Sequence, residues 1–277
     1  MLKARVITAL LMLPVALLIL FVLPPDAFAL AVGCIVLMGA WEWVRLSGMV
    51  SRVARWPLLA VFGALLWAAY QLPQVYVPMV LGIGCVFWIG AALMVWMYPR
   101  SKEQVGGRRM KLGFGLLVLI PAYVALLYLR RHDTHLLLIA ILVGVIWAAD
   151  VGAFFVGRRF GVRKLAPEVS PGKSWAGVAG GVVMALVIGL SSAWIGEPNG
   201  ALFPLSAWVW LIFICAVTVL FSVLGDLFES LIKREHGVKD SSALLPGHGG
   251  ILDRIDSLTA ATPVFALLVY LTGWPLP

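Results

Sequence analysis

The sequence predicts an all-α, polytopic integral membrane protein with about nine transmembrane helices and a single integral domain over residues 1–277. Hydrophobic residues make up 62% of the chain and charged residues only 12%. The mean hydropathy of +1.01 is too high for a soluble domain, because so much apolar surface could not be buried inside it. No polar stretch is long enough to build a second domain.

Nine apolar windows carry the helix prediction, and each is close to the roughly 20 residues that cross the hydrocarbon of a bilayer. The first window follows Lys3 and Arg5 and resembles a signal peptide, but its length favours a retained helix. The window at 56–72 has the weakest signal. The windows lie at residues 5–23, 27–46, 56–72, 77–98, 112–129, 134–155, 175–195, 203–224 and 257–274.

The basic residues predict the orientation. With nine spans the connections alternate between two sides, and 19 of the 21 Lys and Arg residues then fall on one side, leaving Arg130 and Arg131 on the other. The positive-inside rule places the N-terminus in the cytoplasm and the C-terminus in the periplasm. We expect the N-terminal helices to cover about residues 1–130, and the catalytic helices with their cytoplasmic loops to cover about residues 134–277. We expect no nucleic-acid partner.

Residues 230–256 form the most polar segment of the chain and lie between two apolar runs. Such a segment beside a membrane usually marks a site. Its carboxylates suit a hard divalent cation, its basic groups suit phosphates, and its glycines let backbone amides approach a ligand. His248 lies among these glycines, either in a phosphate-binding loop or in a plain turn, and one histidine without cysteines does not make a zinc site.

One acidic pair precedes this segment and another lies at its end. Asp226 follows an apolar run with no cation close in sequence, so it requires a metal, a partner or water. If its helix continues, Asp226, Glu229 and Lys233 share one face. Asp253 and Asp256 lie where the last helix begins, and there they are either ligands or caps of the helix N-terminus.

Two further polar clusters are expected on the same side. One contains Asp150 and the run 157–161, and the other is 170–174, directly before a span. The second cluster lacks the eight-residue Walker pattern. Its lysine and its helix entry either hold a phosphate or only set the topology.

The segment 230–256 resembles the signature of phosphatidate cytidylyltransferases, also called CDP-diacylglycerol synthases. The runs 150–161 and 170–173 look like the other polar motifs of that family. The chain departs from the family pattern at Ala176, where an acidic residue is common, and at Ser174, where threonine is common. The agreeing positions of the signature are Ser230, Ile232, Lys233, Arg234, Lys239, Asp240, Ser242, Leu245, Pro246, His248, Gly249, Gly250, Ile251, Asp253, Arg254, Ile255 and Asp256.

The resemblance implies transfer of the cytidylyl group of CTP to phosphatidic acid, with Mg²⁺ and possibly a second cation. It also implies a homodimer in the bacterial inner membrane whose active site faces the cytoplasm. The implied catalytic residues are Asp226, Asp253, Lys233 and Arg254, the first two as metal ligands. The implied substrate-binding residues are Ser170, Lys173, Ser174, Lys233, Arg234, Lys239, His248, Gly249, Gly250 and Arg254, with Asp150, Asp240 and Asp256 in support.

Two other functions fit parts of the pattern. A CTP-dependent, polyprenol kinase-like enzyme would phosphorylate a lipid alcohol and release CDP, whereas cytidylyl transfer releases pyrophosphate. An ion-coupled transporter would use Asp150 and Asp226 as cation sites, and it would carry matching interrupted helices in two repeated halves. The sequence shows no such repeat.

Overall fold

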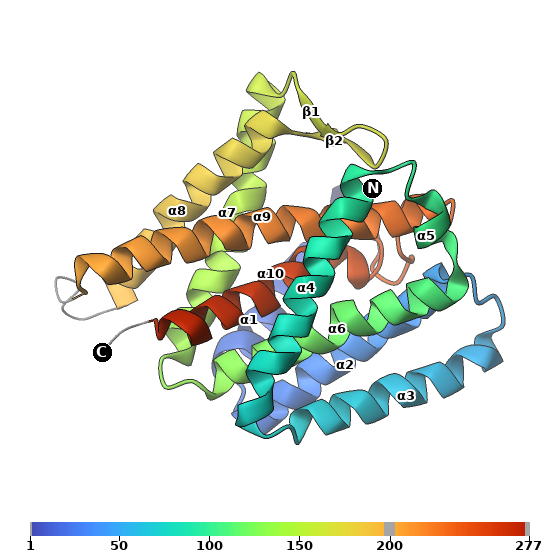
Figure 1. Cartoon of the computed structure of the whole chain (residues 1–277), viewed down its shortest axis with the longest axis horizontal. Helices are drawn as coiled ribbons and strands as arrows, with labels where there is room; N and C mark the ends of the chain where they lie inside the picture. The colour runs from blue at the N-terminus through green and yellow to red at the C-terminus, as the bar shows by residue number, and fades with distance from the viewer. Residues whose placement is uncertain (1, 197–202, 275–277) are drawn as a thin grey trace.

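The computed structural model describes residues 2–196 and 203–274. Over these residues the chain is a bundle of long helices with one small hairpin (Figure 1). Eight described helices are long and apolar enough to cross a membrane. Their bounds are α2 Pro25–Leu46, α3 Arg52–Tyr70, α4 Val77–Trp96, α6 Arg108–Arg131, α7 His135–Phe160, α8 Trp175–Gly196, α9 Leu205–Glu235 and α10 Leu252–Thr272.

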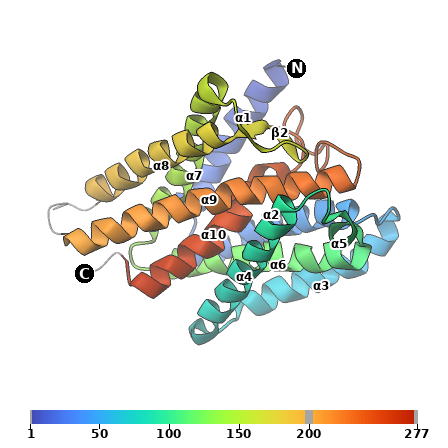
Figure 2. The same cartoon turned by 45° about the horizontal axis from the view of Figure 1, so that its top comes forward.

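The first predicted span is a different kind of helix from the other eight. The α1 helix, Leu2–Leu17, continues into a π-helical turn over Leu18–Val22, and its apolar part is shorter than the other spans. It projects from the bundle at the N-terminal end (Figure 2). The all-α class is therefore confirmed, with eight candidate spans and one shorter apolar helix.

The last two spans extend further than their apolar windows. The α9 helix continues past residue 224 to Glu235, and α10 begins at Leu252 instead of residue 257. Beyond the window, Leu227, Phe228 and Leu231 still point into the core. An apolar face with helical spacing continues the helix after the mean hydropathy has fallen.

The sequence did not predict two short elements. Helix α5 covers Lys102–Gly106. Strands β1, Lys164–Ala166, and β2, Ser170–Ser174, form an antiparallel hairpin between α7 and α8. The hairpin pairs Lys164 with Ser174 and Ala166 with Ser170, and it lies above α9 in Figure 1.

Small residues bring the helices that carry the site into backbone contact. A Cβ atom on Gly152 of α7 would clash with the carbonyl of Gly180 on α8. On α9, a Cβ on Gly225 would clash with the carbonyl of Asp256 on α10. Close approach through glycine is typical of helix pairs in membranes. The polar residues beside these glycines are thereby held at short range.

An aromatic cluster fixes α2 against the helices that carry the site. Trp43 of α2 and Phe228 of α9 stack at 6.4 Å between ring centroids, and Phe87, Trp88 and Phe114 pack around Phe228. The Trp43 indole also donates to the carbonyl oxygen of Lys111 at 2.6 Å. Buried aromatic pairs of this kind add stability beyond their area. They set the position of the neighbouring residue, Glu42, relative to α9.

Candidate active site

The three polar clusters predicted from the sequence meet at one end of the bundle. Lys173, in the hairpin, forms an ion pair with Asp226 of α9 at 2.6 Å. Asp150 of α7 lines the same cleft as Lys173. Arg234, at the end of α9, lies 3.4 Å through its Nε from the carbonyl oxygen of Val169. Segments far apart in sequence thus form one polar surface.

Asp253 organises residues 236–251, which we call the signature loop. One oxygen of its carboxylate lies 2.6 Å from the Lys233 ammonium. The other accepts from the backbone amides of Ser241 and Gly250, at 2.9 and 2.7 Å, and lies 2.9 Å from the Ser241 hydroxyl. Gly249 has a φ of +83°, which favours glycine, and a Cβ there would crowd the Asp253 carboxylate. Both oxygens of the Asp253 carboxylate therefore already have hydrogen-bond donors from the protein.

Asp226 is more open than Asp253. Its side chain is 35% exposed, against 7% for Asp253. Besides Lys173 it accepts a hydrogen bond from the Ser230 hydroxyl at 3.2 Å. Its second oxygen contact is thus a neutral hydroxyl that a ligand can displace at small cost. Of the two predicted metal ligands, Asp226 is the more available.

Two other carboxylates stand close to this pair. Glu229 of α9 is buried, and its carboxylate lies 3.4 Å from the Lys233 ammonium. Asp256 of α10 lies near enough to Asp226 and Glu229 for their charges to act on it. The predicted common face of Asp226, Glu229 and Lys233 is confirmed, since α9 is helical through all three.

Sequence reasoning missed Glu42 of α2. Its carboxylate is 2% exposed and reaches across the bundle to the signature loop. It accepts from the hydroxyls of Ser241 and Ser242, at 2.9 and 2.5 Å, and from the backbone amides of Ile251 and Leu252, at 3.0 and 2.8 Å. The last two amides begin α10, so Glu42 caps that helix from another element.

The Glu42 contact also explains Gly250. A Cβ on Gly250 would clash with both oxygens of Glu42 and with the hydroxyl of Ser241. Glu42 lies inside an apolar run, which is the same signal that singled out Asp226. A search for carboxylates inside apolar runs of the N-terminal half would therefore have identified Glu42 from the sequence. Arg45, one helical turn later, donates to the carbonyl oxygen of Ser241.

The signature-loop side carries cations that point to solvent. Arg234, Lys239 and Arg254 are exposed, and no ion pair joins them to another described residue. His248 is partly buried, with an Nδ1 atom that lacks a hydrogen-bond partner in the described part of the chain. These groups are able to contact an anion without breaking an existing ion pair.

His236, just after α9, differs from these residues. Partial burial lowers its pKa below the ordinary value, and the nearby cations Lys111, Arg45 and Arg55 lower it further. The imidazole is therefore neutral near pH 7. It adds no positive charge to the loop.

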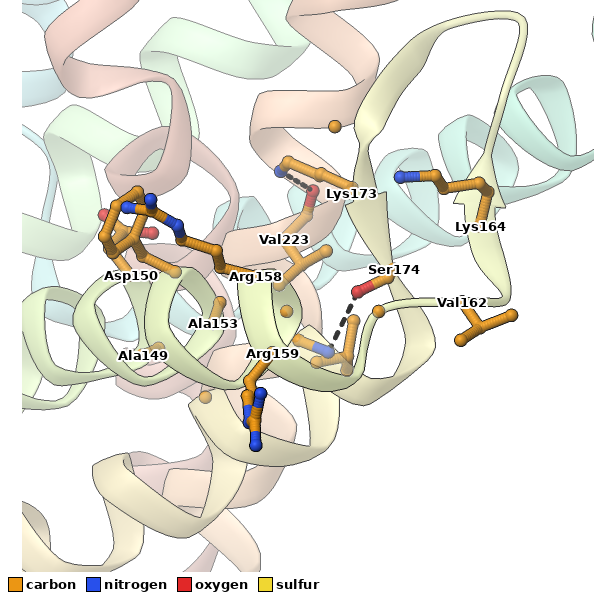
Figure 3. Close-up of a pocket in the computed structure, with 17 residues that line it drawn as sticks. Ala149, Asp150, Ala153, Arg158, Arg159, Val162, Lys164, Lys173, Ser174 and Val223 are labelled. Atoms are coloured by element: carbon orange, nitrogen blue, oxygen red, sulfur yellow. Dashed lines mark hydrogen bonds between the residues drawn. The ribbon is translucent and has the colours of Figure 1, made fainter.

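A cleft of about 670 Å³ opens between α7, the hairpin and α8. Figure 3 shows Arg158 and Lys164 on the same side of the α7 ribbon as Lys173, whereas Arg159 points the opposite way. Asp150 also lines this cleft and is exposed. The cleft combines cations with a carboxylate next to the Lys173–Asp226 ion pair.

Three predicted site residues show no contact that points to a ligand within the part of the chain that the structure describes. Ser174 is buried, and its hydroxyl accepts from the amide of Gly177 at 3.2 Å, which is the geometry of a helix cap. Asp240 is exposed at the edge of the loop, and Ser170 is partly buried in β2. The predicted nucleotide contacts of these three residues stay predictions.

The acidic residues fit magnesium by donor type. Among the residues that the structure describes, no three His, Cys, Asp or Glu side chains form a ready-made metal cluster. Magnesium is usually bound through one or two carboxylates, with waters and substrate phosphates completing the shell. Asp226, open and beside the cleft, matches that pattern, whereas Asp253 would have to give up Lys233 or the loop amides.

Comparison with known proteins agrees with this architecture. A model described as the cytidylyltransferase family matches residues 3–272. The chain is 48% identical to a phosphatidate cytidylyltransferase of Pseudomonas aeruginosa over the whole of both chains. It is 42% identical to one of Haemophilus influenzae, over 98% of this chain and 99% of the relative, and 34% identical to one of Brucella suis, over 98% and 93%.

The fold and the site define a polytopic membrane protein with a polar surface, rich in exposed cations, at one end of its helices. The chain belongs to the cytidylyltransferase family.

We expect Glu42→Ala to lower the unfolding temperature and to reduce turnover at least tenfold. The change leaves the Ser242 hydroxyl and the amides of Ile251 and Leu252 without their acceptor, which costs about 2 kcal/mol or more. Glu42→Asp should recover part of both losses. Thermal unfolding and limited proteolysis of the signature loop measure the effect. Glu103→Ala, at an exposed glutamate of α5, is the control. If the signature loop of the Glu42→Ala variant resisted protease as well as that of the wild type, the role of Glu42 would be contradicted.

Proposed function

We propose that the chain transfers the cytidylyl group of CTP to phosphatidic acid, giving CDP-diacylglycerol and pyrophosphate. The observation that carries the proposal is the complete signature of residues 230–256, in a chain that matches the cytidylyltransferase family over residues 3–272. The relatives named above are named for this activity, and the chain matches the first two of them over 99% or more of their length. An active site at the ends of membrane-spanning helices suits one lipid substrate and one water-soluble substrate.

The proposed reaction does not require a strong general base. An oxygen of the phosphatidic acid phosphate attacks the α-phosphorus of CTP, a new P–O bond forms, and the bond to the β-phosphate oxygen breaks. The attacking phosphate is already ionised at neutral pH. The barrier comes from bringing two polyanions together and from charge on the departing pyrophosphate, so catalysis depends on positioned cations.

The described residues supply those cations on both sides of Asp226. Lys173 lies against Asp226 on the hairpin side. Lys239 and Arg254 belong to the signature-loop side, whereas Arg234, at the end of α9, lies between that loop and the hairpin. We assign these three cations to the triphosphate together with His248. Lys233, by contrast, is buried between Glu229 and Asp253, so its first task is to hold the loop. Its predicted substrate contact remains a proposal.

Magnesium belongs to this proposal as well. The all-oxygen donors and the open Asp226 carboxylate support it. Magnesium bound there would neutralise phosphate charge beside Lys173. Asp256 and Glu229 stand next to Asp226, and we propose them as outer carboxylates that tune this position. A second cation and the homodimer implied by the family resemblance stay predictions.

We also propose that the protein lies in the bacterial inner membrane with the site facing the cytoplasm. The distribution of Lys and Arg between the two sets of connections supports this orientation. CTP is a cytoplasmic metabolite, so the same orientation gives the site access to its substrate.

The product identifies the reaction. Purified protein in detergent, incubated with cytidine-labelled CTP, phosphatidic acid and magnesium, should move the cytidine label into the lipid extract and release pyrophosphate. A polyprenol kinase-like enzyme would leave the label in water as CDP. Release of CDP with a newly phosphorylated lipid would replace the proposed function with that alternative.

We expect Asp226→Asn and Asp253→Asn to behave differently. Each should reduce turnover at least about a hundredfold, because several kcal/mol of charge stabilisation depend on these carboxylates. Asp253→Asn should also lower the unfolding temperature, since it weakens the contact to Lys233. Asp226→Asn should unfold like the wild type. Turnover, magnesium titration and thermal unfolding separate the two roles.

The control for both variants is Asp133→Asn, an exposed aspartate between α6 and α7. Near-normal turnover of the Asp226→Asn variant at ordinary magnesium would remove Asp226 from the site. Loss of folding in both variants would instead make both carboxylates structural.

Reporter fusions test the orientation. A reporter after the last residue should read as periplasmic, and one near Lys102 should read as cytoplasmic, because the basic connections stay inside. A cytoplasmic C-terminal reporter would mean that the number of membrane crossings differs by one.

A further inference from the structure

We propose that the cleft between α7, the hairpin and α8 binds the phosphate group of the lipid substrate, with Arg158 and Lys164 as its ligands. This inference rests on the proposed function and divides the site between its two substrates. The lipid phosphate lies on the hairpin side of the Lys173–Asp226 ion pair. The nucleotide lies on the signature-loop side.

Two of the four described cations that line the cleft, Arg158 and Lys164, are the first argument, because Arg159 points to the other side of α7 in Figure 3. Arg158 and Lys164 are exposed, and the structure shows no ion pair or side-chain hydrogen bond for either within its described ranges. Lys173, at the inner end, is already paired with Asp226 at 2.6 Å. All three lie on one side of α7 in Figure 3. A phosphomonoester would satisfy the two unpaired cations and still reach Lys173.

The rest of the lining favours a lipid over a nucleotide. Its exposed side chains include Phe154 and Val162, with relative exposures of 58% and 92%. Its one uncharged polar side chain, Ser174, is occupied by the Gly177 amide. A cytosine needs partners for its ring nitrogen, amino group and carbonyl, and this wall offers it few. An acyl chain needs none.

The position of the cleft gives a lipid a route. The cleft lies at the ends of α7 and α8, both of which are candidate membrane spans. Its lining shares Val178 and Val223 with a second groove of about 500 Å³. That groove is mostly apolar and includes Trp96, Leu220 and Leu224. A lipid in the adjoining leaflet can therefore place its phosphate in the cleft while its chains remain in apolar surroundings.

The division also brings the reacting groups together. Asp226 and Lys173 form the boundary between the two cation groups, so the lipid phosphate and the α-phosphate of CTP would meet beside them. The side chains that bind one substrate are then not the ones that bind the other. Substitutions in the cleft should act on one Michaelis constant alone.

The test compares Arg158→Gln, Lys164→Gln and the double variant with Arg163→Gln. Arg163 is an exposed cation beside Lys164 that does not line the cleft. In mixed micelles we expect the double variant to raise the apparent KM for phosphatidic acid about tenfold and to leave the KM for CTP within about twofold. The Arg163→Gln variant should match the wild type in both constants.

A binding measurement separates this inference from the proposed function. Short-chain phosphatidic acid, but not diacylglycerol with the same chains, should raise the unfolding temperature of the wild type. The double variant should lose this response and keep its response to CTP. This readout does not depend on turnover, so it remains informative if the wild type forms no CDP-diacylglycerol.

Three results would overturn the assignment. A rise in the KM for CTP instead of the lipid constant would make the cleft a nucleotide site. A double variant that still responds to phosphatidic acid would remove both cations from the lipid site. A wild type that responds equally to diacylglycerol would show that the phosphate is not recognised.

Discussion

The signature loop is held by two carboxylates, Asp253 from α10 and Glu42 from α2, and the rest of the site depends on this arrangement. The Ser241 hydroxyl lies 2.9 Å from both of them. Around it, backbone amides of the loop and of the start of α10 point at one carboxylate or the other. A polar loop of this length, at the end of a membrane bundle, would otherwise lack fixed acceptors for its amides. Lys239 in the loop and Arg254 at the start of α10 owe their positions to this buried network.

The network changes the interpretation of the glycines. Gly249 and Gly250 were expected to let backbone amides approach a phosphate. In the structure they let the backbone approach Asp253 and Glu42, and the Gly250 amide already donates to Asp253. In the described arrangement the Gly250 amide serves the protein itself, so the proposed recognition of phosphates relies mainly on side chains. Arg234, Lys239 and Arg254 suit that task because no carboxylate within the described residues neutralises them.

The same end of the bundle separates two kinds of charge. Buried carboxylates and Lys233 stabilise the signature loop, whereas Lys173 lines the cleft and pairs with Asp226 beside it. The Lys173–Asp226 pair is partly exposed, so in the proposed reaction either partner can turn to a substrate or to a metal at small cost. The buried pairs cannot adjust at small cost, because removing one partner leaves a charge without compensation. Structural and chemical tasks are thus assigned to different ion pairs.

The sequence by itself determined the positions of eight of the nine predicted membrane spans, the helical class and the residues of the signature. Apolar windows carry this information because the bilayer sets the length of each helix. The contact between Glu42 and the signature loop was decided only by the tertiary structure, since it joins residues about 200 positions apart through the packing of Trp43 against Phe228. The extension of α9 to Glu235 and the β1–β2 hairpin also followed from packing rather than from hydropathy. Hydropathy records how each segment meets the lipid, whereas contacts between segments depend on which faces the folded bundle brings together.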